Sequence, residues 1–368
     1  MSGWIGWSLM EGLGLGVSRL FFSLGGNVSP SLAHILFAAI CAGCFQMLSG
    51  CVMILIKKES LRVSGRWHTF APLGLGVGGL IANGCAFAAF QAVSRADMAA
   101  SNFLATVPVV LLGAFGGWAI PRFSEKVRRL LRCKTTESLF EREPLGWRQA
   151  AGLGFAIGGA YLAIPISFSA LWNNGIPSWV WFSLGTATFA AINEFISKGM
   201  ARWEKLNKRP KLNPWVLQFW GGVSMITAAL GGFLFLAQPV ARVEIIATDF
   251  LWVYGIGAGA SNVAWWSCRL LAYQKDAPVS IRRFPTIGVS LFVAAAIGAI
   301  GFGGSFWSKL PGIVLFAPAF FFGQNGSEKY LRDAWDFIQS HTSMAPAISM
   351  KEGGDATPSL ALEKRMAS

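Results

Sequence analysis

Long apolar segments alternate with short polar ones along most of the chain, which predicts a bundle of membrane-spanning helices. Each apolar segment has about 20 residues, enough for a helix to cross the roughly 30 Å hydrocarbon core of a bilayer. Helices are the expected form because a backbone in lipid must satisfy its own hydrogen bonds. The predicted spans are 4–24, 31–56, 70–93, 99–119, 148–169, 178–198, 214–237, 250–272, 278–299 and 307–323.

Charge is scarce and unevenly placed. The chain has 368 residues and is only 13% charged, against about 25% in soluble domains. If the N-terminus is cytoplasmic, 26 of the 31 Lys and Arg residues fall in cytoplasmic segments. By the positive-inside rule this asymmetry predicts a multi-pass protein of the cell inner (cytoplasmic) membrane with both termini in the cytoplasm. It also accounts for the net charge of +13 without a nucleic-acid partner.

Two halves of the chain resemble each other. An offset of 175 pairs Trp4 with Trp179, and an offset of 179 pairs Gly78 with Gly257. Five spans per half is an odd number, so the second half must cross the membrane in the opposite sense. Inverted repeats of this kind are typical of alternating-access transporters.

The predicted fold class is therefore an all-α polytopic membrane protein with ten transmembrane helices in two inverted five-helix repeats. Residues 1–169 form the first repeat, which includes a long basic cytoplasmic loop at 120–147. Residues 176–323 form the second repeat. Residues 324–368 are expected to form a cytoplasmic amphipathic helix and a disordered tail.

Three segments together match the span pattern of one known family. AVSRADMAASNFLATVPVVLLG (92–113) has a short hairpin between two predicted spans, followed by Pro-Val. With GWRQAAGLGFAIGGAYL (146–162) and KLPGIVLFAPA (309–319), it resembles the span 3–4 hairpin and spans 5 and 10 of the drug/metabolite transporter superfamily, with its ten-span EamA-like members. The resemblance covers about residues 4–323. It implies a central substrate site among spans 1, 3, 4, 6, 8 and 9.

Four ionisable residues lie well inside predicted spans: Glu11, Arg19, Glu194 and Arg269. Such residues are functional candidates because burying a charge without a partner is costly. The helix rise puts Arg19 about 22 Å and Glu11 about 10 Å from the cytoplasmic start of span 1. Glu11 is therefore closer to Glu194 in depth than Arg19 is. Either carboxylate is a candidate for carrying a coupling proton, and the alternative for all four residues is structural pairing or snorkelling.

Arg282 and Arg283 lie about 7 Å into span 9 from its cytoplasmic end. Snorkelling to anionic headgroups is the favoured interpretation of this pair, and anion recognition is the alternative. The triose-phosphate and nucleotide-sugar branch of the superfamily carries a basic pair in span 9 and a lysine late in span 6. The resemblance thus implies that Arg282, Arg283 and Lys198 contact substrate, with arginine gripping phosphate or carboxylate bidentately.

Several other residues are candidates for substrate binding. Asn83 and Asn262 occupy equivalent places in glycine-rich spans, where an amide can bind substrate or link helices. Trp265 follows Asn262 and can line an aromatic cavity wall or simply pack between helices.

Other motifs favour structural roles. Gly74, Gly76 and Gly79 match the dinucleotide fingerprint, but without a βαβ unit we interpret them as sites of close helix packing. Cys41 and Cys44 form a C-x-x-C pair that we interpret as small buried thiols, since no second cluster completes a metal site. We identify no catalytic residues and predict neither enzymatic activity nor a cofactor.

Together these patterns predict a secondary active transporter that moves a small polar, anionic or zwitterionic metabolite by alternating access. Its expected partners are the small-molecule substrate and the lipid bilayer, and the sequence leaves open whether it forms a homodimer. The alternative is a non-transporting integral membrane scaffold or a membrane-embedded enzyme.

Overall fold

The computed structural model describes residues 3–28, 31–63, 65–92, 129, 147–163, 176–277 and 279–323, and these are largely helical, without strands. The helices are α1 Gly3–Val28, α2 Leu32–Lys57, α3 Arg66–Ala92, α5 Trp147–Ala163, α7 Ser178–Leu206, α8 Pro214–Leu236, α9 Pro239–Ile246, α10 Asp249–Tyr273, α11 Val279–Phe302, α12 Phe306–Val314 and α13 Phe316–Gly323. The chain separates into two compact units, Met1–Asn325 and Gly326–Ser368, and these helices belong to the first.

The protein is a multi-pass helical membrane protein. Within the described residues, four helical segments are long and apolar enough to cross a bilayer: Leu32–Lys57, Trp67–Gln91, Pro214–Leu236 and Pro285–Phe302. Helices also occupy the positions of the other predicted spans within the described ranges. The predicted span 99–119, most of the loop 120–147 and the C-terminal segment 324–368 lie outside the described residues.

Two boundaries differ from the prediction. The expected single span 307–323 is divided into α12 and α13 at Leu315. Pro318 explains this break, because proline cannot donate a hydrogen bond to the carbonyl four residues earlier and its ring crowds that carbonyl. Helix α7 continues to Leu206, eight residues beyond the predicted end at Lys198. This extension carries three charged residues, Arg202, Glu204 and Lys205, so hydropathy alone does not assign it to a span.

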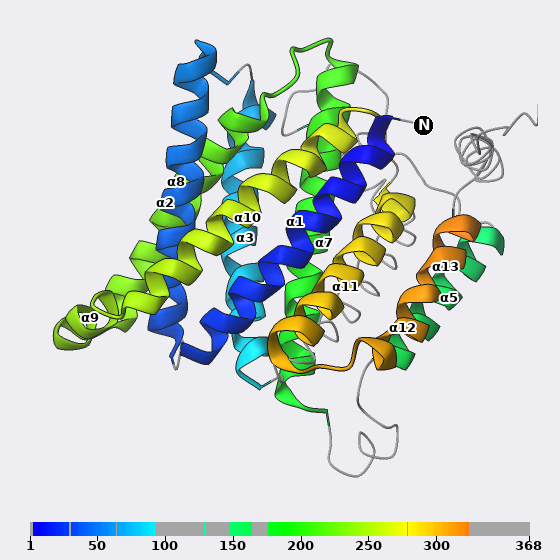
Figure 1. The fold of residues 1–368 in the computed structure, drawn as a ribbon. Helices are drawn as coiled ribbons and strands as arrows, with labels where there is room; N and C mark the ends of the chain where they lie inside the picture. The colour runs from blue at the N-terminus through cyan, green and yellow to red at the C-terminus, as the bar shows by residue number, and fades with distance from the viewer. Residues whose placement is uncertain are drawn as a thin grey trace, which may run out of the picture. The chain divides into compact units, whose positions relative to one another are not determined.

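The helices pack in pairs that are distant in sequence. α1 lies against α10, α3 against α7 and α2 against α8, while α5 lies against α12 and α13 (Figure 1). The α2–α8 contact depends on glycine, since a Cβ atom on Gly222 would lie 2.6 Å from the carbonyl oxygen of Gly43. Across the same interface, Gln46 Nε2 donates to Gln218 Oε1 at 3.0 Å. Small residues allow this approach, and the amide bond links the two helices, although Gln46 Oε1 has no hydrogen-bond partner among the described residues.

Gly76 and Gly79 of the G-x-G-x-x-G motif also pack closely, as predicted, whereas a Cβ atom on Gly74 would make only an ordinary contact with Ile196 at 3.4 Å. A Cβ atom on Gly76 would lie 2.4 Å from the carbonyl oxygen of Gly221, and one on Gly79 would lie 2.5 Å from the Trp266 ring. Cys41 is buried, and a Cβ atom on Gly255 would meet its Cβ at 2.5 Å. Both the fingerprint glycines and this thiol therefore belong to helix interfaces.

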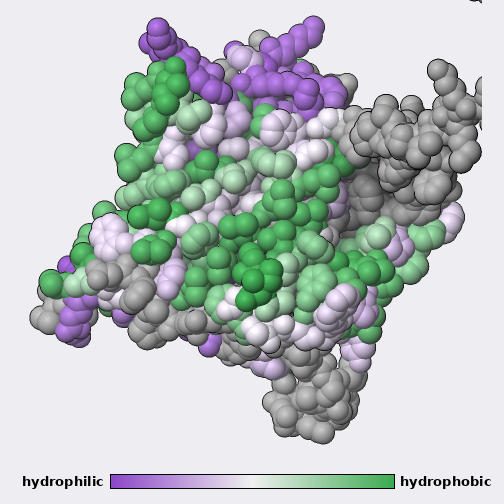
Figure 2. All heavy atoms as spheres, viewed as in Figure 1, coloured by the Kyte–Doolittle hydropathy of each residue, from purple (hydrophilic) through white to green (hydrophobic). Residues whose placement is uncertain are grey.

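Polar side chains gather at one end of the bundle, and hydrophobic ones cover the middle of the visible face (Figure 2). The polar end is where α2 and α7 finish and α8 begins. Its basic residues include Lys57, Lys58, Arg62, Lys205, Lys208, Arg209 and Lys211.

Candidate functional site

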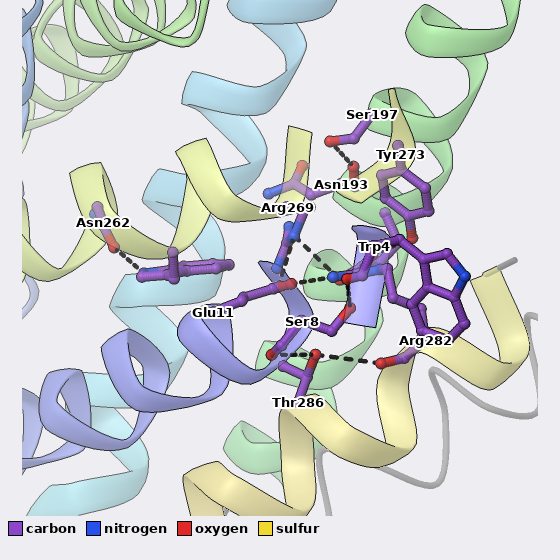
Figure 3. Close-up of polar contacts among 12 residues, drawn as sticks. Trp4, Ser8, Glu11, Asn193, Ser197, Asn262, Arg269, Tyr273, Arg282 and Thr286 are labelled. Carbon is purple, nitrogen blue, oxygen red and sulfur yellow. Dashed lines mark hydrogen bonds and ion pairs between the residues drawn. The ribbon is translucent and has the colours of Figure 1, made fainter. Parts of the chain in front are cut away.

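Four charged side chains from four helices meet in the interior. Glu11 comes from α1, Arg269 from α10 and Arg282 from α11 (Figure 3). Glu194 comes from α7. Each of the four side chains is at most 2% exposed. We call these four residues the buried charge cluster.

Each arginine of the buried charge cluster bridges both carboxylates. Arg282 donates through Nη1 to Glu11 Oε2 and through Nη2 to Glu194 Oε2. Arg269 Nε lies 3.2 Å from Glu11 Oε1, to which it donates, and 3.1 Å from Glu194 Oε1. Glu11 and Glu194 therefore share the same two guanidinium groups, in agreement with the similar depths expected for them.

Aromatic side chains flank both guanidinium groups. The Tyr273 hydroxyl donates to Glu194 Oε2, and the Tyr273 ring centroid lies 4.6 Å from Cζ of Arg282. The Trp265 ring centroid lies 4.4 Å from Cζ of Arg269. Because an aromatic face attracts a cation, each ring stabilises its arginine and shields it from the surrounding apolar helices.

The first turns of α11 are also tied to α1. Thr286 Oγ1 donates to the Ser8 carbonyl at 3.1 Å and to the Arg282 carbonyl at 3.2 Å. A Cβ atom on Gly12 would lie 2.5 Å from the carbonyl oxygen of Thr286. This close approach of the two helices places Glu11 beside Arg282.

The charges of the cluster balance, with two carboxylates and two guanidinium groups. Removing one member of such a buried pair leaves an uncompensated charge, which commonly costs about 3–5 kcal/mol. Two guanidinium nitrogens nevertheless remain without an acceptor among the described residues. They are Nη2 of Arg269 and Nε of Arg282, both fully buried. The cluster thus holds hydrogen-bonding capacity that its own carboxylates do not use.

The expectation that Arg282 snorkels to the membrane surface is wrong. Its side chain is 0% exposed and bonded to two carboxylates from other helices. The depth of Arg282 along span 9 does not reveal its acceptors, because they come from α1 and α7. The backbone of Arg283 belongs to α11, but its side chain lies outside the described residues.

Two other predicted site residues, Lys198 and Arg19, lie at different distances from the cluster. Lys198, one turn beyond Glu194 on α7, donates through Nζ to the Ala277 carbonyl at 2.7 Å, and its Nζ lies 5.8 Å from the Tyr273 ring centroid. Arg19 is buried on α1, eight residues and so about 12 Å along the helix from Glu11. Lys198 thus belongs to the edge of the site, while Arg19 occupies a separate depth.

The predicted asparagines are buried, and each leaves part of its amide unused. Asn262 Oδ1 accepts from Trp265 Nε1 at 2.9 Å, which links it to the ring beneath Arg269. Within the described part of the chain, Nδ2 of Asn83 and of Asn262 have no hydrogen-bond partner. Buried amides are usually satisfied, so these NH₂ groups can donate to a ligand or to water.

Sequence reasoning missed Tyr273 and Asn193. Tyr273 follows Arg269 by one helical turn and so shares its face, a spacing visible in the sequence. Asn193 precedes Glu194 and is 1% exposed, and neither of its side-chain polar atoms has a partner among the described residues. A Cβ atom on Gly78 would lie 2.3 Å from Asn193 Oδ1, so α3 provides the space for this amide.

A second buried pair, His68 and Glu204, joins segments of the fold and lies apart from the cluster. His68 Nε2 lies 2.9 Å from Glu204 Oε1, which also accepts from the Leu212 amide at 2.8 Å. Glu204 Oε2 accepts from Gln274 at 3.3 Å. These contacts join the start of α3, the turn after α7 and the end of α10, which is a structural role. Among the described residues, no three His, Cys, Asp or Glu side chains are grouped as a metal site.

Comparison with known proteins informs the fold alone. No protein-family model matches the sequence, and no curated protein matches it either. Twenty-one chains of solved structures do resemble it in fold. One of them, described only as "Crystal structure of protein", shares 14% identity and a TM-score of 0.56, covering 88% of this chain and 98% of its own. At this identity the similarity supports the arrangement of helices and says nothing of function.

Proposed function

We propose that the chain is a secondary active transporter that moves a small anionic or zwitterionic metabolite across the cytoplasmic membrane. The observation that carries the proposal is the buried charge cluster, with its two buried guanidinium nitrogens lacking an acceptor among the described residues. Ionisable groups inside a membrane protein are expensive and generally mark substrate or proton pathways. A carboxylate or phosphate on the substrate would supply the missing acceptors.

Charge balance suggests how a proton gradient would drive uptake. If Glu11 or Glu194 takes up a proton, the cluster is left with a net charge of +1 in a dry interior. Binding of an anionic substrate group to Arg269 or Arg282 restores neutrality. Proton and substrate would then bind favourably together and unfavourably alone, which is the linkage that symport requires.

The proposed scaffold is a pair of inverted five-span repeats, as in the drug/metabolite transporter superfamily. It is supported by helix pairing, since α1 against α10 and α7 against α3 are equivalent pairs under the repeat. The α2–α8 interface supports it further. Gly43 and Gly222 are 179 positions apart, which is the offset of the repeat, and they lie against each other. Gly43 also lies against Ile226, and Gly222 against Met47. Ile226 and Met47 are 179 positions apart as well. A two-fold axis between these glycines accounts for both contacts.

The proposed orientation places the basic end of the bundle in the cytoplasm. The ends of α2 and α7 carry that charge, whereas the turn between α8 and α10 at the other end contains Arg242 as its single Lys or Arg. Arg269, Tyr273 and Arg282 lie near the end of α10 and the start of α11, so the cluster would occupy the cytoplasmic half of the membrane.

The proposal is tested in two steps. A thermal-shift screen with small carboxylates, phosphates and amino acids should identify a ligand, because a ligand that binds only the folded state raises its apparent stability. Uptake of that ligand into proteoliposomes should then follow an imposed pH gradient. If folded protein gives no flux with any compound of the panel, the chain is a non-transporting membrane protein and the proposal fails.

A further inference from the structure

A cavity of about 280 Å³ lies beside the buried charge cluster, at the basic end of the bundle. It is formed by the end of α7, the turn that leads to α8, and the end of α10. We call it the basic pocket. Its lining residues are Ala201, Glu204, Lys205, Lys208, Arg209, Lys211, Tyr273, Gln274 and Asp276.

The pocket carries an excess of positive charge. Its two acids are already engaged, Glu204 by His68 and Asp276 by Lys205 at 2.9 Å. Lys211 Nζ donates to the Gln274 carbonyl at 3.2 Å, and in the described part of the chain no carboxylate pairs with it. Among the described residues, Lys208 and Arg209 have no ion pair or side-chain hydrogen bond. Three cations therefore face one concave surface without a carboxylate of their own.

Tyr273 forms the wall between this pocket and the buried charge cluster. The residue lines the pocket, while its hydroxyl donates to Glu194 and its ring lies over Arg282. Only 2% of Tyr273 is exposed, so it closes the pocket toward the interior. An anion held by the pocket would thus be separated from the cluster arginines by a single side chain.

We infer that the basic pocket is a binding site for a small anion that bears a phosphate or carboxylate group. Its volume suits a small metabolite or one lipid headgroup, and Arg209 can grip either oxyanion bidentately. The inference does not depend on transport, because the site would bind its anion in a protein at rest. If transport is established, substrate from the cytoplasm would bind in the pocket before it passes Tyr273.

The test uses inorganic phosphate as the probe, with purified full-length protein in detergent and binding measured by calorimetry. The pocket variant combines Lys208→Gln, Arg209→Gln and Lys211→Gln. The matched control combines Lys57→Gln, Lys58→Gln and Arg62→Gln, which removes three cations from the same end of the bundle but outside the pocket. All six positions are exposed, so both variants should unfold at the temperature of the unmodified protein.

The pocket variant should bind phosphate about tenfold more weakly, which is the order expected for three exposed charge contacts. The control should bind as the unmodified protein does, and added salt should weaken binding in both. Equal binding by the pocket and control variants, or no binding by the unmodified protein, would overturn the inference.

A second measurement identifies the source of the anion. The protein is placed in nanodiscs of phosphatidylcholine alone or of phosphatidylcholine with phosphatidylglycerol, and phosphate binding is measured again. Loss of phosphate binding only with phosphatidylglycerol assigns the pocket to a lipid headgroup. Equal binding in both assigns it to a soluble anion. Because no step measures flux, failure here is distinct from failure of the proposed transport.

Discussion

Two helix junctions in this protein bury polar groups in opposite ways. At the α2–α8 interface, glycine backbones touch and one neutral amide pair, Gln46 and Gln218, crosses between the helices. At the buried charge cluster, four helices meet around two carboxylates and two guanidinium groups. The first junction needs only close approach and one hydrogen bond. The second needs four charges to remain matched, which is a costly way to hold helices together.

The difference suggests what each junction is for. An interface that only stabilises the fold is built most cheaply from small residues and satisfied neutral groups. Both junctions keep polar atoms without a hydrogen-bond partner among the described residues, Gln46 Oε1 at α2–α8 and two guanidinium nitrogens at the cluster, but only the cluster buries charge. We therefore expect changes at α2–α8 to alter stability alone, and changes at the cluster to alter function beyond their effect on stability.

The largest effect is expected from Arg282→Gln. It leaves two buried carboxylates with one guanidinium, and we expect a loss of about 3–5 kcal/mol in unfolding free energy together with loss of uptake. The double variant Glu11→Gln with Arg282→Gln restores neutrality and should recover most of the stability, measured by thermal unfolding in detergent. It should not recover uptake. Recovery of both would make the cluster a structural element like the α2–α8 interface.

Tyr273→Phe should have the next largest effect. It removes the hydroxyl that donates to Glu194 but keeps the ring over Arg282. A hydrogen bond to a charged group contributes about 1.5–3 kcal/mol, so we expect a destabilisation of that size and a slower maximal rate of uptake. Tyr161→Phe is the matched control, because Tyr161 is 56% exposed on α5 and takes no part in the cluster. An unchanged rate in folded Tyr273→Phe protein would exclude this hydroxyl from the transport cycle.

Gly222→Ala tests the other side of the comparison. The new methyl group would lie 2.6 Å from the Gly43 carbonyl oxygen, and backbone cannot move aside easily. Overpacking of this kind costs about 1–3 kcal/mol. Gly231→Ala on the same helix is the matched control, because no atom lies within 4 Å of its added methyl. The folded fraction of Gly222→Ala protein should transport at the normal rate. If the folded variant loses uptake, the α2–α8 interface does not serve stability alone, which contradicts the comparison.

The smallest effect is expected from Gln46→Leu. The variant loses the amide pair with Gln218, and such interhelical hydrogen bonds average about 0.6 kcal/mol. Gln218 keeps its bond to Ser267 Oγ at 3.0 Å, which limits the damage. Uptake should be unchanged at saturating substrate. If Gln46→Leu lowers the unfolding free energy by clearly more than about 0.6 kcal/mol, or lowers uptake, this neutral pair does more than join two helices.

Much of the helical scaffold could be predicted from the sequence. Apolar length places α2, α3 and α8 within a few residues, because hydropathy depends only on local composition. The division at Leu315 was missed although Pro318 is visible in the sequence. The extension of α7 to Leu206 was missed because Arg202, Glu204 and Lys205 lower its hydropathy, while its helical form is supported by Glu204 contacts with distant segments.

The charged residues of the candidate site could be predicted from the sequence, but the contacts among them could not. Glu11, Glu194 and Arg269 stand out because charge inside an apolar span is rare. Arg282 was misjudged because its acceptor on Glu11 lies 271 residues away, and only the packing of α11 on α1 brings the two together. A lone helix cannot show whether an arginine near its end turns outward to the headgroups or inward to a carboxylate.

The central claim, that the buried charge cluster couples proton and substrate, is tested most directly by proton uptake during substrate uptake. Proteoliposomes containing a pH-sensitive dye would be given the ligand found by thermal shift. The unmodified protein should acidify the lumen as substrate enters. Folded Glu11→Gln and Glu194→Gln proteins should still exchange substrate across the membrane while at least one of them loses the proton signal. If both variants retain substrate-driven acidification at the unmodified rate, the cluster is not the coupling site.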